Sequence, residues 1–252
     1  MTEEKLLTEF VEKMRAAAGN NLASIILYGS AADGEFHPEY SDLNLLCFLR
    51  EASFASLAAI APVIEWWRKQ KHHPPLVLTP EELTTSADIF SIEFTDMKQR
   101  YRVLHGEDLL RDLNVPMTHH REQLEYELRE KVFLLRQHLL LAGSDEKQLW
   151  DVMLHSLSSF TTLLRHVLIE LGEPGRKHSR DAVVEVSGRL NIDDSAFLQL
   201  LDVRAKKHDR WELRVKDVAA RYLKAIGQVA AAVDTMQSPA GTGDGVSRRE
   251  GI

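Results

Sequence analysis

The sequence predicts an α+β protein in which a small mixed sheet is followed by an all-helical bundle. Within the first 110 residues, short apolar runs of strand length are mixed with amphipathic helical segments. From Arg121 onward the apolar residues recur only at a helical period. We therefore expect a sheet-containing domain over residues 1–115, a helical domain over residues 116–236, and a disordered, glycine-rich tail over residues 237–252.

The first elements follow from apolar spacing and from the residues that interrupt it. Residues 3–18 carry apolar side chains at helical spacing, which predicts a helix. The apolar run 22–28 predicts a strand that ends abruptly at Gly29. The near-continuous apolar run 43–49 predicts a second strand that is buried on both faces.

Four further elements complete the expected sheet domain. Residues 53–71 have helical spacing, and a short apolar run at 76–78 follows two prolines and predicts a strand. Thr79 and Glu82 form a capping box that starts a short helix. Residues 89–95 alternate apolar and polar side chains, so we expect another strand there.

The second half of the chain is predicted to be helical throughout. Leucine and valine residues between 124 and 139 mark one long amphipathic helix. A second long helix runs from 149 to 171 and ends at a glycine and a proline. Weaker helical patterns follow over residues 179–190, 194–206 and 209–235.

Composition narrows the possible partners and the cellular location. The 252-residue chain has a formal charge of −7, which argues against a general nucleic-acid binder. Its single cysteine, Cys47, lies in an apolar run and excludes a disulfide framework. We expect neither a leader nor a membrane-spanning segment, and therefore a cytoplasmic protein. An oligomer is possible.

A candidate site lies where the first two strands meet. On a strand, Asp42 and Asn44 point to the same side, so their oxygens can converge on one hard cation. Gly29 permits a sharp turn, and Ser30 offers a hydroxyl and an amide to a phosphate. Glu93 is a carboxylate in an otherwise apolar predicted strand, where it needs a partner or a task.

These residues resemble the DNA polymerase beta-like nucleotidyltransferase superfamily, in particular small bacterial members related to aminoglycoside adenylyltransferases. The resemblance rests on Leu-Tyr-Gly-Ser at the end of a strand, eleven further residues, and then Asp42-Leu43-Asn44 opening the next strand. It implies attack of a substrate hydroxyl on the α-phosphate of a nucleoside triphosphate, with loss of pyrophosphate, with ATP or another nucleoside triphosphate as co-substrate and with Mg²⁺ as cofactor. By this resemblance Asp42 is a metal ligand, Glu93 is a metal ligand and the candidate base, and Gly29 and Ser30 hold the phosphates.

Asn44 stands where the resemblance implies a second metal-binding carboxylate, so the motif is degenerate. An asparagine carbonyl can bind Mg²⁺ but is neutral, and the lost charge forfeits on the order of several kcal/mol. Two functional hypotheses follow. The first is slow transfer of a nucleoside monophosphate, with AMP as the first candidate, to a hydroxyl of a small molecule or protein. The second is a catalytically inactive nucleotide- or ligand-binding regulator. A third is a helical interaction module with the sheet domain as its scaffold.

Other polar residues give weaker predictions. The second long helix carries a polar stripe opposite its leucines, and Arg165 in this stripe could reach a triphosphate if the stripe lines a cleft between domains. The alternative is close packing against a neighbouring helix. Asp96 is a rival to Glu93, and Arg204 with His208 is expected to be an exposed helix pair. The polar stripe consists of His155, Ser158, Ser159, Thr162, Arg165 and His166. The acidic residues available to bind a polycationic acceptor are Glu170, Glu173, Asp193 and Asp194.

Overall fold

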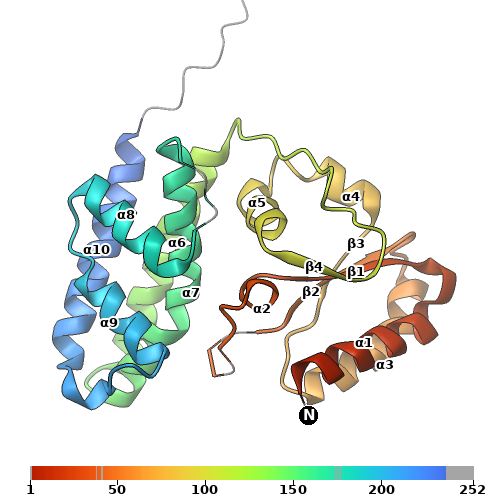
Figure 1. Ribbon diagram of the computed structural model, residues 1–252, viewed down its shortest axis with the longest axis horizontal. Helices are drawn as coiled ribbons and strands as arrows, with labels where there is room; N and C mark the ends of the chain where they lie inside the picture. Colours follow the sequence, from red (N-terminus) through yellow and green to blue (C-terminus); the bar gives the residue numbers. More distant parts are fainter. Residues whose placement is uncertain (1, 38, 41, 174, 176, 237–252) are drawn as a thin grey trace, which may run out of the picture.

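The computed structural model describes residues 2–236 apart from 38, 41, 174 and 176. It has a sheet region with flanking helices beside a separate helical region (Figure 1). The predicted α+β class is therefore confirmed. The tail predicted at 237–252 lies outside the described residues.

The sheet is mixed and has the strand order β3-β2-β1-β4. Strand β1 pairs antiparallel with both β2 and β4, and β2 pairs in parallel with β3 through the crossover helix α3. The bounds are β1 Leu22–Tyr28, β2 Asn44–Leu49, α3 Phe54–Lys69, β3 Leu76–Leu78 and β4 Tyr101–Gly106. The two central strands are buried on both faces, as the apolar run 43–49 predicted for β2.

Helices cover both faces of the sheet. Helices α1 (Glu3–Ala18) and α3 pack on one face, against Ile25 and Leu45 among others. The other face, which carries Ile26 and Leu46, packs against α4 (Pro80–Thr85) and α5 (Ser91–Gln99). The predicted capping box of α4 is present: Glu82 N–H donates to Thr79 Oγ1, and Thr79 N–H donates to the Glu82 carboxylate.

The prediction of a strand over residues 89–95 is wrong, because this segment belongs to α5. Helix α5 lies between the sheet and the helical region, so it is apolar on two sides. Ile92 packs into the core of the helical region, while Phe94 and Met97 pack on the sheet. Two apolar sides on a short helix produce the alternating pattern that is typical of a strand. The edge strand of this part of the chain is β4, which begins at Tyr101.

The helical region consists of five long helices with α7 at its centre. Their bounds are α6 His120–Ala142, α7 Glu146–Glu170, α8 Ser179–Leu190, α9 Ser195–Arg204 and α10 Val215–Thr235. Of the described helices, α7 alone is long and apolar enough to cross a membrane by length and composition, but 61% of its most apolar window is buried among its neighbours. The segment 107–119, which contains no helix or strand, links the two regions.

Candidate active site between the sheet and helical regions

A polar cavity of about 260 Å³ lies where the two regions meet. The end of β1, the turn after it and α5 form one wall, and α7, α8 and α9 form the other. The sheet side contributes Tyr28, Gly29, Ser30, Glu35, His37, Asn44, Asp96 and Arg100, and the helical side contributes Ser158, Thr161, Thr162, Arg165, Ser179, Leu201, Arg204 and Ala205. The cavity therefore combines the predicted phosphate turn with residues that lie more than a hundred positions away.

The turn at Gly29 and Ser30 has the sharp geometry that the sequence predicted. Gly29 has φ +77°, a region that side-chain-bearing residues rarely adopt, and its N–H donates to the carbonyl of Arg100 at 2.9 Å. The short helix α2 (Ser30–Asp33) begins immediately after it. A Cβ at Gly29 would lie 3.3 Å from Nδ2 of Asn44, so Asn44 stands directly beside the turn.

The three predicted metal donors do not converge. Asn44 lines the cavity, but Asp42 does not; its carboxylate is half-exposed and lies 3.8 Å from Nε2 of His73. Glu93 is on a helix rather than a strand, and its carboxylate accepts a hydrogen bond from Nε2 of Gln123 at 3.2 Å. Burial raises the pKa of Glu93, and the nearby Glu127 carboxylate adds to this effect. The expectation of three donors aimed at one divalent ion is therefore wrong.

The later strands do not supply the missing carboxylate. The later strands β3 and β4 read Leu-Val-Leu and Tyr-Arg-Val-Leu-His-Gly, so neither carries an acidic side chain. Over residues 2–236, apart from the four that are not described, no cluster of three or more His, Cys, Asp and Glu side chains is arranged to hold a metal ion. The residues present thus do not fit the Mg²⁺ site that the resemblance implied.

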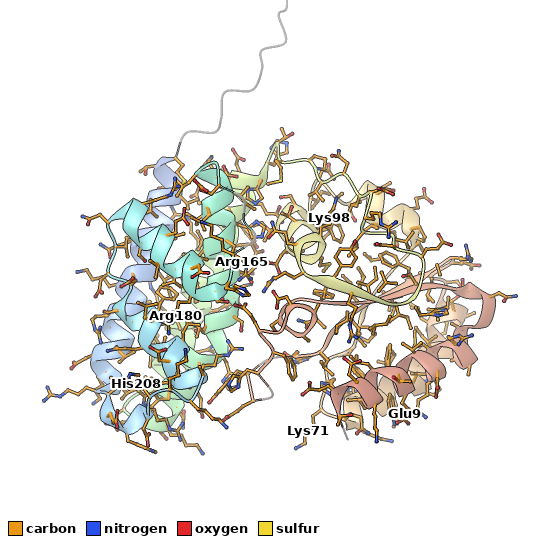
Figure 2. All side chains as sticks on the ribbon, viewed as in Figure 1. Glu9, Lys71, Lys98, Arg165, Arg180 and His208 are labelled. Carbon is orange, nitrogen blue, oxygen red and sulfur yellow. The ribbon has the colours of Figure 1, made fainter. Side chains whose placement is uncertain are left out.

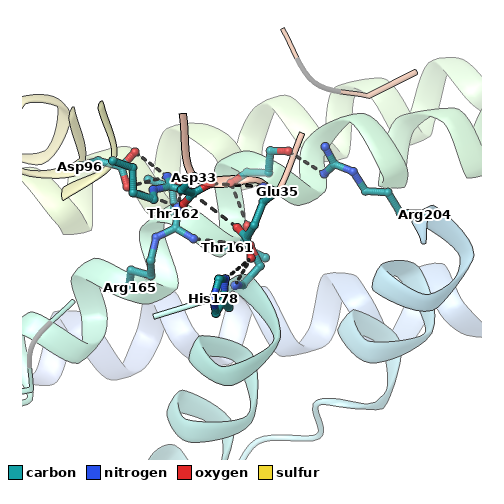
Figure 3. Close-up of polar contacts among 11 residues, drawn as sticks. Asp33, Glu35, Asp96, Thr161, Thr162, Arg165, His178 and Arg204 are labelled. Atoms are coloured by element: carbon teal, nitrogen blue, oxygen red, sulfur yellow. Dashed lines mark hydrogen bonds and ion pairs between the residues drawn. The ribbon is translucent and has the colours of Figure 1, made fainter. Parts of the chain in front are cut away.

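The cavity instead contains a buried ion cluster around Asp96. Nη2 of Arg100 donates to both carboxylate oxygens of Asp96, at 2.9 and 2.7 Å, and Nη2 of Arg165 donates to Oδ1 at 3.3 Å (Figure 3). Because Arg100 lies in the sheet region and Arg165 in α7, Asp96 is bonded to both regions. Burial alone would raise the pKa of Asp96, but the two guanidinium groups outweigh it and lower that pKa.

Glu35 makes a second connection between the regions. Its carboxylate accepts hydrogen bonds from the N–H and the hydroxyl of Ser179, both at 3.0 Å, at the first residue of α8. Nδ1 of His178 lies 3.2 Å away. Burial would raise the pKa of Glu35, but the bonds from Ser179 and the charges of Arg165 and Arg100 lower it. This carboxylate caps a helix of the other region.

Arg165 and Arg204 come from the helical side of the cavity. Nη2 of Arg165 also donates to Thr162 at 2.7 Å, and Figure 2 shows Arg165 where the helical region faces the sheet region. Arg204 ends α9; it donates to Ser158 at 2.6 Å and to the carbonyl of Tyr40 at 3.1 Å. The expectation of an exposed pair is wrong for Arg204, while His208 is exposed beside Glu212.

The predicted polar stripe of α7 is divided among three environments. Ser158, Thr162 and Arg165 line the cavity, whereas His155 and Ser159 line a separate groove against α6. The sixth residue of the stripe, His166, is buried. Its Nδ1 lies 2.8 Å from Nε2 of His120, whose Nδ1 contacts Glu170. Burial, and then His120, lower the pKa of His166 to about 3.

Sequence reasoning missed Glu35, Arg100 and Arg204 as cavity residues. The position of Glu35 could have been predicted from its distance in sequence, because it follows the Gly29-Ser30 turn by five residues, in the short segment that connects this turn to the next strand. No local pattern marks Arg100 or Arg204, because each reaches the cavity only through the packing of α5 or α9.

The two lowered carboxylate pKa values predict acid sensitivity of the contact between the regions. Glu35 and Asp96 are stabilised as anions in the folded protein, so their contribution to stability is complete above the unfolded pKa values of about 4. It is lost as the pH falls below about 4 and through the lower folded values. Urea unfolding at a series of pH values should show this loss, and Asp96→Asn should reduce it. An equal acid dependence in Asp96→Asn would contradict the assignment.

Part of the chain is similar to a known family of domains. Residues 5–100 match the family model described as a nucleotidyltransferase domain. The structure is similar to that of a spectinomycin adenyltransferase from Enterococcus faecialis solved with ATP and spectinomycin, with a TM-score of 0.58 and 12% identity over 91% of this chain and 99% of that chain. At this identity the similarity establishes the shared fold alone. A comparison with curated protein sequences gives no match.

Proposed function

We propose that this chain, whose amino-terminal residues form a nucleotidyltransferase domain, binds a nucleoside triphosphate between its sheet and helical regions and transfers the nucleoside monophosphate only slowly. ATP is the first candidate nucleotide, and a hydroxyl of a small molecule or protein is the acceptor. The observation that carries the proposal is the single cavity that joins the Gly29-Ser30 turn to arginines of both regions, while the predicted metal donors stay apart.

The proposed roles follow from charge and position. The turn brings backbone and the Ser30 hydroxyl close to a phosphate, because Gly29 leaves no Cβ in the way. Arg204 reaches the cavity from α9 and supplies positive charge on the opposite wall. Arg165 contributes charge from α7. Asn44, beside the turn, offers an amide to the same phosphates.

The second candidate function is nucleotide binding for regulation, without transfer. The separation of Asp42, Asn44 and Glu93 favours it, because a chain without a converged metal site loses much of the charge stabilisation on which phosphoryl transfer depends. Incubation with α-labelled ATP, Mg²⁺ and glycerol as a generic hydroxyl acceptor separates the two. Slow labelling of glycerol supports transfer, and none at all supports regulation.

Nucleotide binding itself is tested by calorimetric titration with ATP. We expect binding in the absence of Mg²⁺, and an affinity that changes by less than about threefold when Mg²⁺ is added, because the polyphosphate meets arginines rather than a metal site. Gly29→Ala should weaken ATP binding by about tenfold, since it strains the backbone and displaces the turn from Asn44.

Gly143→Ala is the matched control. Gly143 also has a positive φ, +56°, but it lies at the end of α6 with nothing within 4 Å of a new Cβ. It carries the same kind of strain away from the cavity. Failure of the native chain to bind ATP, or equal weakening by the two substitutions, would contradict the proposed function.

A further inference from the structure

A groove between α6 and α7 has no role in the proposed function. It has a volume of about 420 Å³, which is sufficient for a small organic molecule. None of the described residues that line this α6–α7 groove also lines the nucleotide cavity. Helix α6 contributes Lys131, Leu134, Leu135 and His138, and α7 contributes Asp151, Val152, His155, Ser156, Ser159 and Phe160.

Four apolar side chains lie in the α6–α7 groove. Leu135 and Phe160 are buried and form its floor, whereas Leu134 and Val152 are only partly covered by the protein. Leu134 is 39% exposed. A ring or an alkyl chain that lies on these four side chains would remove more of their surface from water, and each Å² of apolar surface contributes about 25 cal/mol. The groove therefore favours a ligand with an apolar body.

The two ends of the α6–α7 groove carry different polar groups. Because the short turn 143–145 joins α6 to α7, the two helices run in opposite directions, and the lining residues nearest the turn share one end of the groove. His138 and Asp151 therefore lie at the end near the turn. Lys131 and Ser159 lie at the other end, two helical turns or ~10 Å away. One ligand can thus meet a different charge at each end.

The positive charge of Lys131 is already compensated. Its Nζ lies 3.2 Å from the carboxylate of Glu127 and 3.1 Å from that of Glu130. Burial alone would lower the pKa of Lys131, but the two carboxylates outweigh it and raise that pKa. Lys131 is the only lysine or arginine among the described residues that line the groove. An anionic ligand would have to compete with both glutamates for it, so the groove does not favour an anion.

The negative charge of Asp151 is not compensated. Within the part of the chain that the structure describes, the Asp151 carboxylate has neither a hydrogen-bond donor nor an ion-pair partner. The carbonyl of Asp151 accepts a hydrogen bond from Nδ1–H of His155 at 2.7 Å, which leaves Nε2 of the neutral His155 ring as an acceptor. An ammonium group has three donors and no acceptor, so it suits a carboxylate beside an imidazole nitrogen.

We infer that the α6–α7 groove binds a primary organic amine with an apolar body. The ammonium group lies at Asp151 and His155, near the turn. The apolar body lies on the four apolar side chains and extends toward Lys131. Because the groove and the nucleotide cavity share no described lining residue, this site requires neither a nucleotide nor a metal ion.

Four probes separate the contribution of charge from that of apolar contact: 2-phenylethylamine, 2-phenylethanol, phenylacetate and ethanolamine. The first three share a benzene ring with a two-carbon arm and differ in charge, whereas ethanolamine keeps the ammonium group but lacks the ring. Each is titrated into the native, nucleotide-free chain and followed by saturation-transfer NMR. We expect 2-phenylethylamine to bind at least about tenfold more tightly than each of the other three.

Asp151→Asn keeps the shape of the side chain but removes its charge. It should weaken 2-phenylethylamine by about tenfold and change the affinity for 2-phenylethanol by less than about twofold. Asp234→Asn is the matched control, because Asp234 is an exposed carboxylate of α10 that pairs with Arg129 and does not line the groove. It should change neither affinity. If Asp151→Asn fails to fold, the four probes on the native chain still decide.

The outcomes separate this inference from the proposed function. No binding of 2-phenylethylamine, or binding of 2-phenylethanol or phenylacetate that is equally tight, would overturn the amine site. The same holds if Asp151→Asn binds 2-phenylethylamine as tightly as the native chain, or if Asp151→Asn and Asp234→Asn weaken it equally. Since these titrations contain no nucleotide, failure of the chain to bind ATP would contradict the proposed function alone.

Discussion

Asn44→Asp combined with Leu76→Glu is expected to raise Mg²⁺-dependent release of pyrophosphate from ATP by roughly two to three orders of magnitude over the native chain. We chose position 76 for the second substitution from the pairing of strands in the sheet. Leu76 on β3 is paired in parallel with Leu46 on β2, so the two side chains share a face. Asn44 lies two residues before Leu46 and therefore points to that same face, toward the cavity.

Leu76 can accept a carboxylate without damage to the core. Its side chain is 42% exposed, and its loss removes little packing. The two introduced carboxylates would then place two anionic oxygen donors on the same face of neighbouring strands, whereas the Asp42 carboxylate lies beside His73 and is not one of them. Each added charge is worth on the order of a few kcal/mol at an effective dielectric of about 20, and about 1.4 kcal/mol corresponds to a factor of ten in rate.

The matched control is Asn44→Asp with Leu76→Gln, which has the same shape but lacks the second charge. It should show only a small gain, as should Asn44→Asp alone. Activity is measured as pyrophosphate release with and without Mg²⁺, and metal binding as a Mn²⁺ titration. Equal rates for the glutamate and glutamine variants would contradict the assignment of this edge as an incomplete metal site.

The predictability of the fold depended on where each segment sits. The central strands and the long helices were predictable, because each has one type of neighbour and therefore one clear apolar period. Helix α5 was not, because it contacts the sheet through Phe94 and the helical core through Ile92. Glu93 was misplaced as a consequence. The hydrogen-bond partner of Glu93 is Gln123, which lies on α6, thirty residues later, and no local sequence pattern predicts this contact.

The same reasoning explains which parts of the candidate site could be predicted. Gly29 and Ser30 were predictable because the turn is local and its backbone requires glycine. The ion cluster was not, since Arg165 meets the local i,i+4 pair of Asp96 and Arg100 only when α5 docks between the regions. A local sequence pattern can therefore predict a turn and the residues that form it. It cannot predict a cluster of side chains from two regions, because that cluster depends on how the regions pack.

Arg165→Met is expected to lower the free energy of unfolding by about 3–5 kcal/mol, the largest loss we predict for one cavity residue. Arg165 is 2% exposed, and its guanidinium offsets the charge of Asp96. Methionine fills a similar volume, so the loss comes from the weaker compensation of the buried Asp96 carboxylate, which keeps only Arg100, rather than from a void. Arg180→Met, at an exposed position of the helical region, should change stability by less than about 1 kcal/mol.

A double-mutant cycle with Asp96→Asn assigns that loss to its cause, by urea unfolding at pH 7. Neutralising Asp96 removes the buried charge that Arg165→Met leaves behind, so the double variant should be more stable than the sum of the single losses by about 0.5–3 kcal/mol. Arg100 continues to bond the remaining amide oxygen, which limits the cost of Asp96→Asn itself. Strictly additive losses would mean that Arg165 stabilises the chain through other contacts, such as its hydrogen bonds to Thr162 and Ser179, and not through the ion pair with Asp96.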